Sequence, residues 1–114
     1  MTECPFCRMV RREIPAQVVY EDEDTLVIRD INPQAPSHLL AIPKKHYAAI
    51  HEVPPSESAF FDKLFRAVTA VLAQEKLIDD SYRLVVNSGA KSGQSVFHIH
   101  VHILSGRRMH WPPG

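Results

Sequence analysis

The sequence has only two cysteines, no long hydrophobic run and no net excess of charge of either sign. Cys4 and Cys7 are separated by two residues, so they cannot cross-link distant segments, and a disulfide-stabilised scaffold is excluded. No apolar run approaches the roughly 18 residues that span a bilayer, and the segment 1–15 lacks the apolar region of a secretory signal. We therefore expect a cytoplasmic protein with no membrane partner.

The length limits the domain organisation. A chain of 114 residues, 45% of them hydrophobic, can bury one real core but not two. We expect a single domain that covers residues 1–114.

The two parts of the chain differ in charge. Residues 1–80 contain all 13 acidic residues and nine of the 13 Lys and Arg, a net charge of −4, whereas residues 81–114 contain four Lys and Arg and no acid. An acid-free segment suits a phosphate better than a hard cation such as Mg²⁺, which prefers carboxylates. Four cationic residues without interleaved aromatics are few for a duplex-binding surface, so we expect no nucleic-acid partner.

The apolar pattern predicts an α+β fold with an antiparallel sheet. Apolar residues recur at helical spacing through residues 60–72, which predicts one long helix with Ser56 or Ser58 as its N-cap. A second, short helix is expected near residues 4–12. Short β-rich runs, two of them separated by the acidic turn "EDED", predict strands at residues 17–22, 25–30, 37–43, 81–88 and 96–104.

The stretch "FHIHVHIL", residues 97–104, has a histidine at every second position. Side chains alternate along a strand, so one face is expected to carry the imidazoles, and the other to face the helix. Neutral imidazoles can bind a metal, attack phosphorus or protonate a leaving group. The histidine face comprises His98, His100 and His102, and the helix-facing side comprises Phe97, Ile99, Val101 and Ile103.

Two chemistries compete for the histidine face. A catalytic zinc or iron site commonly recruits a carboxylate or a further histidine, and no acid follows Asp80. In the second chemistry a neutral histidine attacks phosphorus and a neighbouring histidine protonates the leaving group. The preceding loop "GAKSGQS" would supply N–H and hydroxyl donors to the phosphate, so the nucleophilic alternative uses more of the sequence.

The stretch "HIHVHIL" matches the His-x-His-x-His-x-x signature of the histidine triad family, and the resemblance extends over three blocks of the sequence. They are "RDINPQAPSHLLAIPKKHY", "VVNSGAKSGQSVFHIHVHIL", which contains the signature, and "GRRMHWPPG". The blocks look like the histidine triad nucleotide-binding (Hint) branch, whose members are purine nucleoside phosphoramidases. The "WPPG" ending differs from the diadenosine polyphosphate hydrolases of the fragile histidine triad branch.

This resemblance implies roles for individual residues. His100 resembles the nucleophile that becomes nucleotidylated, His102 would protonate the departing amine or contact the phosphate, and His38 resembles the additional histidine beside the triad. Asp30 and Asn87 match residues near the ribose. The purine pocket would be lined by Ile31, Ile28, Phe6 and Met9, and the phosphate loop would comprise Gly93, Gln94 and Ser95.

The segment "CPFC" departs from many Hint proteins, since the animal enzymes generally lack this cysteine pair. Some microbial members have it, and the related galactose-1-phosphate uridylyltransferases bind zinc through a comparable Cys-x-x-Cys and two histidines. This similarity implies a structural, tetrahedral zinc site made by Cys4, Cys7, His46 and His98. Two thiols without a metal remain the alternative.

The resemblance implies a hydrolase that cleaves the P–N bond of purine nucleoside phosphoramidates, such as adenosine 5'-monophosphoramidate, through a nucleotidylated histidine, without an organic cofactor. It also implies a homodimer, in which two five-stranded sheets join into a ten-stranded one and the long helices pack together. Two alternatives stay open: a purine-nucleotide-binding regulatory module with incidental activity, and a metal-dependent hydrolase that uses the triad as ligands.

Overall fold

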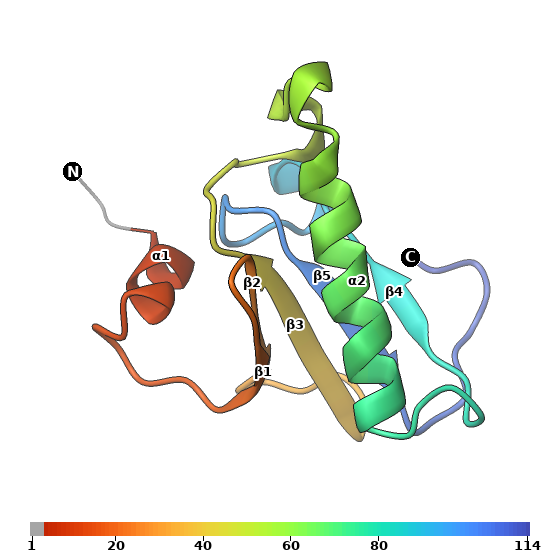
Figure 1. Cartoon of the computed structure of the whole chain (residues 1–114). Helices are drawn as coiled ribbons and strands as arrows, with labels where there is room; N and C mark the ends of the chain where they lie inside the picture. The colour runs from red at the N-terminus through yellow and green to blue at the C-terminus, as the bar shows by residue number, and fades with distance from the viewer. Residues whose placement is uncertain (1–3) are drawn as a thin grey trace.

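A computed structural model describes residues 4–114, so the first three residues of the expected domain lie outside it (Figure 1). One five-stranded antiparallel sheet has the strand order β1-β2-β3-β5-β4, which confirms the predicted α+β class. The strands are β1 (Val18–Glu21), β2 (Thr25–Arg29), β3 (Ser37–Pro43), β4 (Arg83–Val85) and β5 (Val101–Ser105), and the helices are α1 (Pro5–Val10) and α2 (Ala59–Gln74).

The sheet separates two hydrophobic clusters. Figure 1 shows α2 lying across the sheet, while α1 stands at the side of β1 and β2. Alternation along β2 divides its side chains: Val27 joins the cluster that contains α2 residues, whereas Leu26 and Ile28 join the cluster of Phe6 from α1. The histidine-bearing end of β5 therefore has a helix core on one side and α1 on the other.

The structure corrects several local predictions. The last strand begins at Val101, so His98 and His100 lie in the segment that leads into β5, and only His102 of the three lies within the strand. Phe97 was predicted to face the helix, but this side chain is 52% exposed, because the chain bends at residues 96–98 before the strand alternation begins. Strand β4 is shorter than predicted, and Ser58 occupies the N-cap of α2 without a side-chain hydrogen bond.

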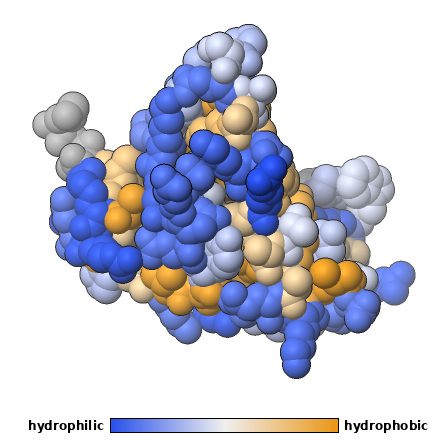
Figure 2. Space-filling model, in the orientation of Figure 1, coloured by the Kyte–Doolittle hydropathy of each residue, from blue (hydrophilic) through white to orange (hydrophobic). Residues whose placement is uncertain are grey.

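The surface of the described residues is largely polar. Hydrophilic side chains cover most of the face in Figure 2, and apolar side chains are exposed between them along its lower part. The longest helix has 16 residues, and within residues 4–114 no helix has the length and apolarity needed to cross a bilayer. Large apolar side chains exposed on α2 and near or on the edge strand β4 include Phe65, Tyr82 and Leu84.

Candidate active site and metal centre

The fold gathers four of the chain's histidines on the sheet face opposite α2. Antiparallel pairing places His38 of β3 opposite Leu104, and Leu40 opposite His102, so His38 and His102 are diagonal neighbours on one face. His98 and His100 precede β5 and are 0% and 5% exposed. Register between distant strands therefore adds His38 to the triad.

The environment of His100 fixes the position of its ring proton. Its Nδ1 lies 2.7 Å from the carbonyl oxygen of His98. A carbonyl can only accept, so Nδ1 carries the proton and Nε2 keeps a free lone pair. Burial lowers the pKa of His100, and the edge of Phe6, with ring centroids 5.0 Å apart, contributes to this burial. His100 is therefore a neutral imidazole with a nucleophilic Nε2.

A second set of hydrogen bonds orients His102. The backbone N–H of Gln34 donates to Nδ1 of His38 at 3.0 Å, so the proton of a neutral His38 is on Nε2. That Nε2 lies 2.9 Å from Nδ1 of His102 and 3.4 Å from a carboxylate oxygen of Asp30. His102 therefore accepts at Nδ1, and its own proton is on Nε2. Burial lowers the pKa of His102 to about 4, so this N–H belongs to a neutral ring at pH 7.

The first histidine of the triad faces away from these two. His98 donates from Nε2 to the carbonyl oxygen of Pro43 at 2.7 Å, so its Nδ1 is unprotonated. This Nδ1 lies 3.4 Å from Sγ of Cys4, 3.7 Å from Sγ of Cys7 and 2.9 Å from Nδ1 of His46. Burial lowers the pKa of His98 to about 4, which keeps the lone pair available at neutral pH. Neutral His98 thus has the protonation state of a metal ligand.

These two cysteines and two histidines fit a tetrahedral zinc ion. Their four ligand atoms all lie within 4.8 Å of one another. Zn–N and Zn–S bonds in a tetrahedron separate neighbouring ligand atoms by about 3.3 to 3.8 Å. The separations between Sγ of a cysteine and Nδ1 of a histidine of 3.4, 3.4 and 3.7 Å fall in that range, whereas the two imidazole nitrogens lie 2.9 Å apart. The structure thus brings together all four residues predicted for the metal.

A second group of potential ligands fits a metal less well. Asp30, His38 and His102 also place ligand atoms within 4.8 Å of one another. However, the N–H of Gln34 occupies the lone pair of Nδ1 in His38, so the Nε2 that faces the group carries a proton. A metal at that atom would require His38 to change tautomer against a backbone donor. The hydrogen bonds therefore favour a row of hydrogen-bonded side chains, in which His38 donates a proton from Nε2, over a metal site.

The residues predicted for the nucleotide are distributed around these histidines. Phe6 and Ile28 are buried in the cluster beneath α1, with Met9 packed against it, whereas Ile31 is 93% exposed. Asp30 follows β2, and one of its oxygens also accepts the N–H of Asn32 at 2.8 Å. Phe6 thus lies beside His98 and His100, whereas the side chain of Ile31 stands in solvent.

The loop before the triad is braced by one buried amide. Gln94 is 4% exposed; its side chain accepts from the N–H of Gly89 and donates to the carbonyl of Ala48, each at 2.7 Å. The oxygen and the nitrogen of the side-chain amide are therefore both hydrogen-bonded to backbone groups. The neighbouring Gly93 and Ser95 are exposed. The last member of the predicted set, Asn87, follows β4, and its Nδ2 would lie 3.9 Å from a Cβ built on Gly93.

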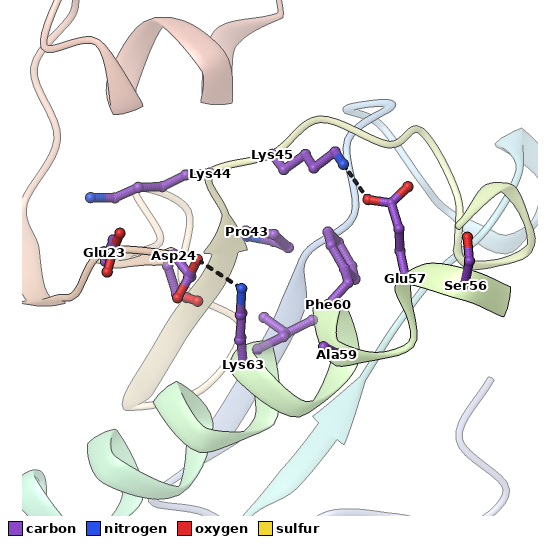
Figure 3. Close-up of a pocket in the computed structure, with 12 residues that line it drawn as sticks. Glu23, Asp24, Pro43, Lys44, Lys45, Ser56, Glu57, Ala59, Phe60 and Lys63 are labelled. Carbon is purple, nitrogen blue, oxygen red and sulfur yellow. Dashed lines mark hydrogen bonds and ion pairs between the residues drawn. The ribbon is translucent and has the colours of Figure 1, made fainter. Parts of the chain in front are cut away.

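One cavity lies away from these residues. It has a volume of about 610 Å³ between the β1–β2 turn, the end of β3 and the start of α2, and Figure 3 shows two pairs of oppositely charged side chains in it. Lys45 pairs with Glu57, and Lys63 lies 3.6 Å from Asp24. None of the site residues predicted from the sequence is among the described residues that line it.

Sequence reasoning missed the backbone groups that select the tautomers. The N–H of Gln34 and the carbonyl oxygens of Pro43 and His98 each determine where a histidine proton resides. Every residue has such groups, so no residue type marks them in a sequence.

Comparison with known proteins identifies the family. The HIT domain family model matches residues 11–109. A 14 kDa zinc-binding protein of Zea mays is 46% identical over 111 residues, covering 96% of this chain and 86% of that protein.

Two crystal structures extend the comparison. A HIT family hydrolase from Legionella pneumophila superposes with a TM-score of 0.94 at 47% identity, covering 98% of this chain and all of the other. A histidine triad nucleotide-binding protein from Candida albicans has a TM-score of 0.82 at 29% identity, covering 96% of this chain and 83% of the other. The chain therefore belongs to the HIT family.

Proposed function

We propose that this protein is a hydrolase that cleaves the P–N bond of purine nucleoside phosphoramidates, as members of the Hint branch do. The observation that carries the proposal is the buried, neutral His100, whose Nδ1–H is held by the His98 carbonyl so that Nε2 keeps its lone pair. The name of the Legionella protein, a hydrolase, and that of the Candida protein, a nucleotide-binding protein, support the same class of activity.

In the first step Nε2 of His100 attacks phosphorus and the P–N bond breaks. The Nε2–H of His102 donates to a phosphoryl oxygen, where negative charge increases in the transition state. Because His102 is neutral and accepts at Nδ1 from His38, we assign it as a hydrogen-bond donor. The leaving nitrogen departs as an amine after taking one proton from solvent, and the nucleotide stays bonded to His100.

In the second step water attacks the same phosphorus. One proton of that water goes to solvent, the bond between phosphorus and Nε2 breaks, and a nucleoside monophosphate leaves. The exposed Gly93 and Ser95 would hold the phosphate through backbone N–H and hydroxyl groups, as predicted for this loop. Both steps use the same face of His100, so one phosphate position serves the whole reaction.

The nucleoside would bind beside α1. Met9, which is partly exposed and packs against the buried cluster of Phe6 and Ile28, would offer apolar surface to a purine. Asp30 has a carboxylate oxygen 3.4 Å from Nε2 of His38 that would accept from a ribose hydroxyl. Ile31 is exposed and could cover a bound base only from the solvent side. Asn87 remains a predicted ribose-side residue.

We also propose that Cys4, Cys7, His46 and His98 bind a structural zinc ion. Four protein ligands leave no open position, so the ion would contribute folding free energy by tying α1 to the segment before β5. The name of the Zea mays relative, a zinc-binding protein, supports this assignment. The catalytic histidines would depend on zinc only through the stability of the fold.

Turnover of adenosine 5'-monophosphoramidate tests the activity. We expect release of AMP and a nucleotidylated His100 that can be trapped and located by mass spectrometry. Binding of AMP without turnover would instead favour the nucleotide-binding module. Loss of activity in folded, chelator-treated protein would favour the metal-dependent hydrolase.

Elemental analysis tests the metal. Protein prepared without chelator should contain about one zinc per chain. The double variant Cys4→Ser, Cys7→Ser should lose the zinc and melt at a lower temperature, yet retain turnover while folded. Well under half an equivalent of zinc in the wild-type protein would contradict the assignment.

A further inference from the structure

The C-terminal segment packs against the loop that carries the Gln34 N–H. Gly106 has φ of 95°, and a Cβ built on it would lie 2.8 Å from Cβ of Pro36. Such a separation is too short for any side chain at position 106, so the glycine backbone lies directly against the Pro36 ring. The segment after β5 and the loop before β3 therefore form a close contact.

The next residue adds a polar contact to the same loop. Nε–H of Arg107 donates to the carbonyl oxygen of Gln34 at 3.1 Å, and a terminal guanidinium nitrogen donates to the carbonyl of Arg108 at 3.0 Å. The second bond holds the guanidinium plane against its own chain. Gln34 is thereby held at its carbonyl by Arg107, while its N–H holds Nδ1 of His38.

We propose that Arg107 is a positioning residue that keeps His102 in its donor tautomer. The chain of bonds runs from Arg107 to the Gln34 carbonyl, from the Gln34 N–H to His38, and from His38 to Nδ1 of His102. Its catalytic consequence rests on the proposed function, but the tautomer itself is a property of the free protein.

The alternative arrangement shows what Arg107 prevents. The N–H that faces His38 belongs to the Pro33–Gln34 peptide and the carbonyl that Arg107 holds belongs to the next peptide, so the two are coupled through the backbone of Gln34. If the Pro33–Gln34 peptide rotated and presented the Pro33 carbonyl instead, Nδ1 of His38 would carry the proton and Nε2 would become an acceptor. His102 would then have to donate from Nδ1, and the neutral ring would present a lone pair to the phosphate. Two lone pairs, one on His102 and one on the phosphoryl oxygen, would repel each other. A single change at Gln34 therefore reverses the role of His102.

The test compares Arg107→Gln with the matched control Arg108→Gln. Both side chains are exposed, so neither substitution removes core packing, and the Arg108 carbonyl remains in its variant. Nitrogen-15 NMR of the imidazoles reports which ring nitrogen carries the proton. We expect wild type and the Arg108 variant to show Nε2–H at His38 and His102, and the Arg107 variant to show a mixture of tautomers. Unchanged imidazole spectra in Arg107→Gln would overturn the proposal.

Kinetics supply the second readout. With a phosphoramidate substrate, we expect Arg107→Gln to lower kcat roughly tenfold with KM little changed. Misplacement of a catalytic group can lower the rate by about 10²-fold, so this decrease is of a reasonable size. Arg107→Lys, which retains one donor for the Gln34 carbonyl, should recover most of the loss. A fall in kcat with wild-type imidazole spectra would also overturn the proposal, because the effect would then not pass through the tautomer. Absence of turnover in the wild type would reject the proposed function alone, since the spectra decide the role of Arg107 independently.

Discussion

Replacing His100 and His102, one at a time, by glutamine tests the assigned tautomers directly. A glutamine at position 102 can accept at its oxygen from His38 and donate from its amide N–H, as the His102 ring does. A glutamine at position 100 can donate to the His98 carbonyl, but it presents an amide oxygen in place of the Nε2 lone pair. The two substitutions are chemically identical but should have unequal effects.

The magnitudes follow from the two roles. Loss of a well-placed hydrogen bond to a charged group costs about 1.5 to 3 kcal/mol, so His102→Gln should lower kcat by at most roughly 10- to 150-fold. No other imidazole can replace His100, because His98 directs its lone pair at the two thiols and His102 presents a proton. His100→Gln should lose the covalent route, a decrease of about 10⁴-fold or more.

The assay is single-turnover release of AMP from adenosine 5'-monophosphoramidate, with nucleotide affinity measured separately. His51→Gln is the control, because His51 is exposed in the short 3₁₀ helix Ile50–Glu52. Both active-site variants should still bind AMP. Equal losses in the two variants would refute the tautomer assignment. A larger loss at position 102 would also refute it and would make His102 the leading candidate for the nucleophile.

Three further predictions concern stability and assembly. Thr25→Val should stabilise the fold by about 1 to 2 kcal/mol in urea unfolding, because the buried Thr25 hydroxyl lacks a partner among the described residues; destabilisation would mean that it has one. The folded-state pKa of His102, about 4, lies below the ordinary 6.5. The contribution of neutral His102 to the free energy of unfolding is therefore present above pH 6.5 and is lost as the pH falls toward 4. That loss is at most about 3 kcal/mol; His102→Gln should reduce it, and identical pH profiles would contradict the assignment. Light scattering at micromolar protein should give a dimer, since β4 is an edge strand and Leu84 and Phe65 are exposed, whereas a stable monomer would reject the expected ten-stranded sheet.

The sequence determined the fold to a large extent. Strand β3 begins and ends at the predicted residues, because Pro36 and Pro43 bound an apolar run. The long helix was predicted from its helical periodicity, and strands β1 and β2 from two β-rich runs separated by the acidic turn, and the structure confirms these elements. Local patterns determine these elements, so neighbouring residues contain the information.

The same reasoning was less accurate at the triad. Regular alternation predicted one strand through residues 96–104, but the chain bends at 96–98, and β5 begins only at Val101. The bend directs His98 toward the cysteines of α1, while His100 and His102 stay with His38. Packing against α1 decided this division, and no local pattern reports a contact with a segment some 90 residues away.

The residue types of both candidate sites were evident from the sequence, because cysteine and histidine at these spacings are rare without a chemical role. Their protonation was decided only by the tertiary structure. A neutral imidazole can be a nucleophile, a donor or a ligand, and the choice depends on which nitrogen meets a backbone donor or acceptor. Here the Pro43 carbonyl, the His98 carbonyl and the Gln34 N–H make that choice. Those groups belong to the backbone, so their positions are determined by strand register and loop packing and not by the identity of any residue.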